Sequence, residues 1–161
     1  MVGAVKEWIG LVLRLVVGSV WIAAGALKVT DPAQSVAAVR AYELLPSSLV
    51  SPVGQLLPVV EVVIGAMLIV GLLTRGAAVI SAVLFVAFII GIASVWARGI
   101  NIDCGCFGGG GADPDAASQY PWEIARDVAL LAASVFLVWL RSTRLALDGI
   151  LFRRPAVTGG S

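Results

Sequence analysis

The chain lacks histidine altogether, and it contains only two cysteines among its 161 residues. Imidazole and thiolate groups therefore cannot complete a four-ligand structural zinc site, so a metal would need carboxylates or a second chain. We accordingly predict no metal site. The missing histidine also excludes covalent haem attachment, which uses a C-x-x-C-H motif. A net charge of +1 gives no indication of nucleic-acid binding.

Charged side chains are equally scarce, at 13% of the residues, whereas soluble domains carry roughly 25%. Hydrophobic residues make up 60% of the chain, and the mean hydropathy is +1.01. A helix needs about 20 mostly apolar residues to cross a bilayer. Four runs approach that length and fill about half of the chain: residues 8–27, 53–73, 77–97 and 124–140. We predict one membrane domain over residues 1–161, an all-α bundle of four transmembrane helices in contact with the lipid bilayer.

The first run resembles a signal peptide, because Lys6 precedes it and Ala24-Gly25-Ala26 resembles a cleavage site. It is longer than the usual apolar region of about 7–15 residues, so we expect a retained span. Between the first two runs, segment 33–45 alternates apolar and polar positions and predicts a short helix lying in the interface. Small residues within the runs predict close approach of helices: Gly18, Gly25, Gly65, Gly71 and Gly91.

The orientation follows from the lysines and arginines of the short loops. Six lie on the side of the two termini: Lys6, Arg75, Arg141, Arg144, Arg153 and Arg154. Three lie on the other side: Lys28, Arg40 and Arg98. This asymmetry predicts a plasma-membrane protein with both termini in the cytoplasm and loop 98–121 outside. Aromatic residues mark the expected interfaces, with Trp8 and Trp139 at the inner one and Trp96, Tyr120 and Trp122 at the outer one.

The two cysteines, Cys104 and Cys106, lie one residue apart in this loop, where disulfides form and persist. An i,i+2 disulfide requires a constrained turn at Gly105, and strain makes a disulfide easier to reduce. The glycine-rich run that follows predicts a mobile loop on which the pair is exposed. Thiol–disulfide exchange is therefore our leading interpretation. Transfer of a metal or metalloid and a structural role stay open, although a disulfide closing so short a loop stabilises little.

Charged residues at membrane depth are candidate functional groups. Glu61 lies about two turns into the second run, and Arg126 and Asp127 lie near the start of the fourth. We expect Glu61 to pair with Arg126 or Lys28, or else to relay protons or contact a quinone ring. Arg14 is expected to snorkel to the cytoplasmic interface.

Several short motifs occur in a specific order along most of the chain. They are GSVWIAAGALK at 18–28, DP at 31–32, YELLP at 42–46, PVVE at 58–61 with Gly65, GLLTR at 71–75, and DCGCFG at 103–108. Together they resemble the DoxX-like membrane proteins, and within them the MauE (methylamine utilisation) branch. The resemblance implies a four-helix membrane bundle that acts beside a thioredoxin-like partner in thiol–disulfide metabolism. It extends to disulfide-generating quinone reductases, but these use two cysteine pairs, whereas this chain has one.

The sequence thus favours a membrane thiol–disulfide oxidoreductase. We expect Cys104 and Cys106 to exchange disulfides with an extracytoplasmic thioredoxin-like protein, with Glu61 and Arg126 as further catalytic candidates. Electrons would pass to or from a quinone cofactor or another membrane carrier. The alternative is a non-catalytic scaffold, or a carrier of a thiophilic metal or sulfur species, for a redox complex.

Overall fold

The computed structural model describes residues 2–105 and 109–140, which form five helices and one short hairpin. In chain order these are α1 (Val2–Val29), α2 (Pro32–Ala41), α3 (Ser47–Val70), α4 (Thr74–Ala97), β1 (Ile102–Asp103), β2 (Gly111–Ala112) and α5 (Ala116–Trp139). The two strands pair antiparallel, with Ile102 opposite Ala112. The predicted all-α membrane class is confirmed.

Among residues 2–105 and 109–140, three helices are long and apolar enough to cross a membrane. They are Val5–Val29, Ser47–Val70 and Thr74–Ala97, with mean hydropathies of 2.0, 2.2 and 2.7. The chain is therefore a multi-pass membrane protein whose apolar helices face lipid. Helix α5, which contains the predicted fourth span, has Glu123, Arg126 and Asp127 in its first half, and these charges lower its hydropathy. The four-span count predicted from the sequence is not confirmed by helix composition.

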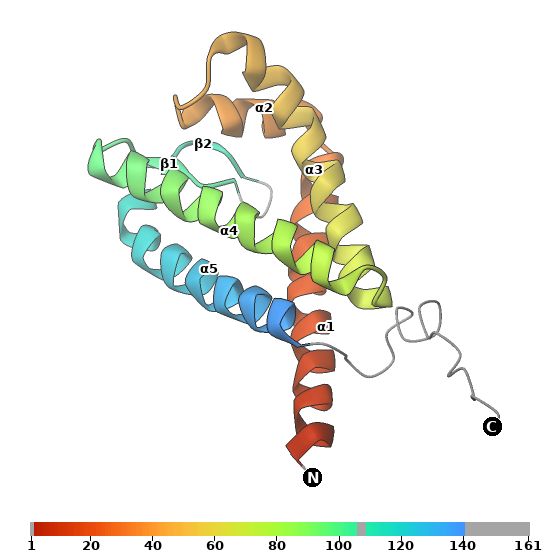
Figure 1. The fold of residues 1–161 in the computed structure, drawn as a ribbon. Helices are drawn as coiled ribbons and strands as arrows, with labels where there is room; N and C mark the ends of the chain where they lie inside the picture. Colours follow the sequence, from red (N-terminus) through yellow and green to blue (C-terminus); the bar gives the residue numbers. More distant parts are fainter. Residues whose placement is uncertain (1, 106–108, 141–161) are drawn as a thin grey trace, which may run out of the picture.

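The helices pair in two layers (Figure 1). Helix α1 packs along α3, and α4 packs along α5. Helices α3 and α4 diverge from the tight turn that joins them, and α2 lies near the open end of this wedge. The predicted helix 33–45 exists but is shorter, since α2 ends at Ala41.

The predicted close approach of helices is confirmed where α1 crosses α3. A Cβ atom on Gly18 would lie 2.9 Å from the carbonyl oxygen of Gly65, and one on Gly65 would lie 2.7 Å from that of Gly18. Only glycine lets the two backbones come so close. Without a hydrophobic drive between helices in lipid, this contact is an important source of association.

A chain of buried hydrogen bonds ties three helices together. The Trp21 indole N–H donates to Ser81 Oγ at 2.7 Å, and Ser81 Oγ lies 3.0 Å from Ser134 Oγ. Ser134 also donates to the carbonyl oxygen of Leu130 at 2.9 Å. These bonds join α1, α4 and α5 through side chains that are buried inside the bundle, so they favour one arrangement of the helices.

The prediction that the Arg14 side chain extends to the cytoplasmic interface is wrong. This side chain is fully buried, at 0% exposure. The guanidinium donates to the carbonyl oxygens of Leu68 and Ile69, at 2.8 and 3.0 Å. The last carbonyls of a helix have no partner within it. Arg14 therefore caps the C-terminal end of α3, where a cation is also favoured by the helix dipole.

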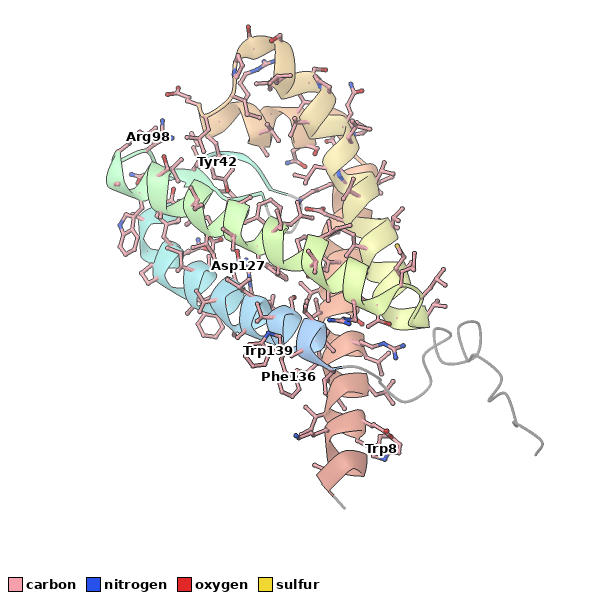
Figure 2. The ribbon with its side chains drawn as sticks, viewed as in Figure 1. Trp8, Tyr42, Arg98, Asp127, Phe136 and Trp139 are labelled. Carbon is pink, nitrogen blue, oxygen red and sulfur yellow. The ribbon has the colours of Figure 1, made fainter. Side chains whose placement is uncertain are left out.

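The aromatic residues expected at the two interfaces differ in exposure. Figure 2 shows Trp8 and Trp139 toward one end of the bundle, with Tyr42 and Arg98 toward the other. The exposed fractions of Trp8, Trp96 and Trp122 are 53%, 47% and 73%, as expected for rings facing lipid or headgroups. Tyr120 was expected among them and is instead buried, at 1%. Its hydroxyl has a structural role, described below.

Candidate functional site

Cys104 lies directly after β1, packed against α2 and α5 rather than displayed on an open loop. Its exposed fraction is 8%, so the prediction of an exposed cysteine is wrong for this residue. The loop is also shorter than predicted, because α5 begins at Ala116 and includes Pro121. Cys106 lies outside the described residues, and the Cys104–Cys106 disulfide therefore stays a prediction.

Two tyrosines hold the backbone around Cys104. The Tyr120 hydroxyl accepts a hydrogen bond from the Ile102 N–H at 2.9 Å and lies 2.9 Å from the carbonyl oxygens of Ile100 and Ile102. The Tyr42 hydroxyl donates to the carbonyl oxygen of Cys104 at 2.8 Å. The chain at Cys104 is thereby fixed from α5 on one side and from the end of α2 on the other.

The next residue, Gly105, turns the chain in a conformation that favours glycine. Its φ is +65°, in the left-handed region, and its N–H donates to Asp103 Oδ1 at 2.9 Å. A Cβ atom here would also lie 2.9 Å from the Cβ of Ala38 on α2. The chain thus turns at Gly105, and the turn that would close the Cys104–Cys106 disulfide stays a prediction because Cys106 lies outside the described residues.

The thiol of Cys104 is held by a carboxylate. Its S–H donates to Glu123 Oε1, with 3.0 Å between Sγ and the oxygen. The other oxygen, Oε2, is buried and has no hydrogen-bond partner among the described residues. Glu123 also lines a small void of about 10 Å³ beside Asp103, Asp113 and Gln119. A carboxylate in this position can accept the thiol proton and exchange it with polar neighbours near the surface.

On its other side, Cys104 borders an apolar cavity of about 310 Å³ within the wedge between α3 and α4. Lys28, at the end of α1, also lines the cavity. The remaining walls come mostly from apolar side chains of α2, α3, α4 and the α2–α3 connection, such as Val39, Leu57 and Phe88. A nucleophilic sulfur and a cationic nitrogen therefore border the same apolar space.

Lys28 is the ion-pair partner of Glu61, one of the two partners expected from the sequence. Lys28 Nζ lies 2.6 Å from Glu61 Oε1, and the two side chains are 6% and 0% exposed. Glu61 Oε2 has no hydrogen-bond partner in the part of the chain that the structure describes. The ammonium also lies 5.4 Å from the centre of the Phe88 ring. A buried charge needs such compensation, since removal of either partner leaves the other uncompensated.

Arg126, the other charged candidate, forms an ion pair with its neighbour Asp127 at 3.0 Å. Both residues border a separate small void of about 10 Å³, next to Trp21 and Phe85. The structure thus groups the candidates into three places: Cys104 with Glu123, Glu61 with Lys28, and Arg126 with Asp127. The cavity connects the first two of these places.

Comparison with known families agrees with this picture of a small membrane bundle. A family model described as "Methylamine utilisation protein MauE" matches residues 6–140. The chain belongs to the MauE family. No curated protein and no solved structure matches the chain.

Two residues of this MauE-family chain near the thiol could not be recognised from motifs alone: Glu123 and Tyr120. The signal that points to them is their helical spacing. The buried stripe of α5 includes Ala116, Tyr120, Asp127 and Leu130, and Glu123 falls on the same face. A carboxylate on an inward-facing stripe is a candidate functional group, because burying it is costly.

Proposed function

We propose that this MauE-family protein is a membrane thiol–disulfide oxidoreductase that uses Cys104 and Cys106. The observation that supports this most directly is the contact between Cys104 Sγ and Glu123 Oε1, at 3.0 Å. The thiolate is the reactive form of cysteine, so a carboxylate that takes the thiol proton promotes exchange. The expected partner is an extracytoplasmic thioredoxin-like protein, in keeping with a relation to the DoxX-like proteins.

The proposed exchange balances as follows in the oxidising direction. A thiolate of the reduced partner attacks the Cys104–Cys106 disulfide, forming a mixed disulfide and releasing one thiolate of this chain. The second thiolate of the partner then attacks the mixed disulfide, which leaves the partner oxidised. Cys104 and Cys106 are now reduced, with Glu123 positioned to exchange a proton with the Cys104 sulfur.

The same proposal includes a topology of four spans, in which α5 crosses the membrane despite its polar first turns. Its exposed side chains toward the C-terminal end are apolar, including Val128, Val135 and Phe136. With both termini in the cytoplasm, as the lysine and arginine distribution favours, Cys104 and Cys106 lie on the extracytoplasmic side. A membrane-impermeant maleimide should then label the reduced cysteines in intact cells, and labelling that requires permeabilised membranes would reverse the orientation.

The exchange itself is tested by trapping with single-cysteine variants. Because Cys104 is only 8% exposed, we expect Cys104→Ser, which retains Cys106, to accumulate a mixed disulfide with the partner. Cys106→Ser should trap less, and the double variant is the control for non-covalent association. If neither single variant yields a covalent complex that reductant dissolves, the exchange proposal fails.

The burial of Cys104 also favours a second candidate function, a non-catalytic membrane scaffold. A scaffold would hold a soluble redox protein without using the thiols. It should therefore keep its function when both cysteines are replaced by serine, whereas an exchange enzyme or a carrier should lose it.

A further inference from the structure

The apolar cavity beside Cys104 has two chemically distinct ends, and nothing in the proposed exchange uses it. We propose that this cavity binds a lipid-soluble quinone, with the ring between Lys28 and Cys104. This inference rests on the proposed function. It adds the molecule that accepts the electrons of the reduced cysteines and the site where that molecule binds. The cavity, of about 310 Å³, is within the range of ordinary small-molecule sites.

The walls suit a flat apolar ring with an apolar tail. Side chains from the α2–α3 connection, α3 and α4 surround the space: Leu44, Leu45, Val53, Leu57, Leu84 and Phe88. Leu44, Leu45 and Val53 are also exposed on the outer surface of the bundle. In a membrane protein this surface meets lipid, so a tail has an apolar path out of the cavity. The open end of the α3–α4 wedge in Figure 1 lies in the same region.

The polar end favours a neutral ligand that carries hydrogen-bond acceptors. Glu61 neutralises Lys28 at 2.6 Å, so an anionic ligand such as a fatty acid meets no net positive charge. The ammonium has three donors, and the Glu61 contact takes one of them. A quinone carbonyl can accept another, whereas a lipid acyl chain offers no acceptor. The buried pair therefore favours a neutral ligand that carries a carbonyl acceptor, and a quinone is such a ligand.

The redox balance agrees with this choice of ligand. Oxidation of a dithiol that includes Cys104 to a disulfide releases two electrons and two protons. A quinone takes up both electrons and both protons and becomes a quinol. Cys104 lines the cavity itself, so the sulfur and the ring would be neighbours within one apolar site.

Binding of decylubiquinone to the full chain in lipid nanodiscs tests the proposal without any turnover. Ala87 is an exposed residue that lines the cavity, so Ala87→Phe should fill part of the ring site and weaken binding about tenfold or more. Ala93→Phe is the matched control, because Ala93 is exposed on the same helix but does not line the cavity. A second variant, Lys28→Met with Glu61→Met, removes the donor without leaving an unpaired buried charge and should also weaken binding.

Equal binding of decylubiquinone to the wild type and both cavity variants would overturn the proposal. Decanol has the same tail length as decylubiquinone but no quinone ring. If decanol displaced bound decylubiquinone as effectively as unlabelled decylubiquinone does, the proposal would be overturned and the cavity would be an alkyl-chain site. Trapping with Cys104→Ser, repeated in the Ala87→Phe background, separates this outcome from a failure of the exchange function. A covalent complex through Cys106 should still form in the double variant, because Ala87→Phe leaves Cys106 unchanged.

Discussion

The buried ion pair between Lys28 and Glu61 should contribute to stability in a way that only a double-variant cycle reveals. Both side chains are almost inaccessible, at 6% and 0% exposure, and their charged atoms are 2.6 Å apart. Replacing one partner by methionine leaves the other charge buried and uncompensated, which costs about 3–5 kcal/mol. Replacing both keeps similar volumes and removes both charges, so the double variant should lie within about 1 kcal/mol of the wild type.

The free energy of unfolding can be measured for Lys28→Met, Glu61→Met and the double variant by reversible unfolding in mixed dodecyl maltoside and SDS micelles. The two single losses sum to about 6 kcal/mol or more and the double variant loses at most about 1 kcal/mol, so the cycle should give an interaction energy of about 5 kcal/mol or more. Glu43→Gln is the control, because the Glu43–Arg98 pair spans 3.9 Å and its side chains are 71% and 35% exposed. It should lose less than about 1 kcal/mol. The reasoning would be refuted if the single variants were as stable as this control. It would also be refuted if the double variant lost as much free energy of unfolding as the two single variants together.

Three further outcomes are expected. Gly65→Leu should lower the thermal stability in detergent strongly, since a Cβ there meets the α1 backbone at 2.7 Å, whereas Gly76→Leu should not, because nothing lies within 4 Å. Tyr120→Phe should cost about 1–3 kcal/mol and speed alkylation of Cys104 by iodoacetamide, because the bonds that fix the loop are lost; an unchanged alkylation rate would contradict this role. Thiol counting after equilibration with glutathione buffers should place the potential of the predicted Cys104–Cys106 disulfide above about −300 mV, and a lower value would make it structural.

The sequence predicted the helices well where hydropathy alone determines them. The runs 8–27 and 77–97 fall within α1 and α4, because a segment surrounded by lipid must satisfy its backbone hydrogen bonds as a helix. The run 53–73 extends past the end of α3, since the residues after Val70 form the turn to α4. The start of α5 was placed eight residues late, at 124 instead of 116, because residues 116–123 are polar on average. Tertiary contacts of Ala116 and Tyr120 stabilise that first part of the helix.

The candidate site was predictable only in part. Glu61 could be recognised because it is a charged residue within an apolar run. The sequence analysis named Lys28 as one of two possible partners, and the structure confirms that pairing. The contact between Cys104 and Glu123 joins residues 19 positions apart across a hairpin, and no local pattern encodes that geometry. The cavity could not be predicted from the sequence either, because it arises from the angle at which α3 and α4 diverge.

Arg14 has a consequence for how the protein is made. A charged arginine within a spanning helix is costly to insert, by up to about 2.5–3.5 kcal/mol at the helix centre on insertion scales. In the finished bundle the carbonyl oxygens of Leu68 and Ile69 compensate this charge. They lie more than 50 residues further along the chain, so α1 leaves the ribosome long before its partners exist. We expect α1 to remain weakly held in the translocon until α3 has been synthesised, and the two helices to enter the lipid as a pair.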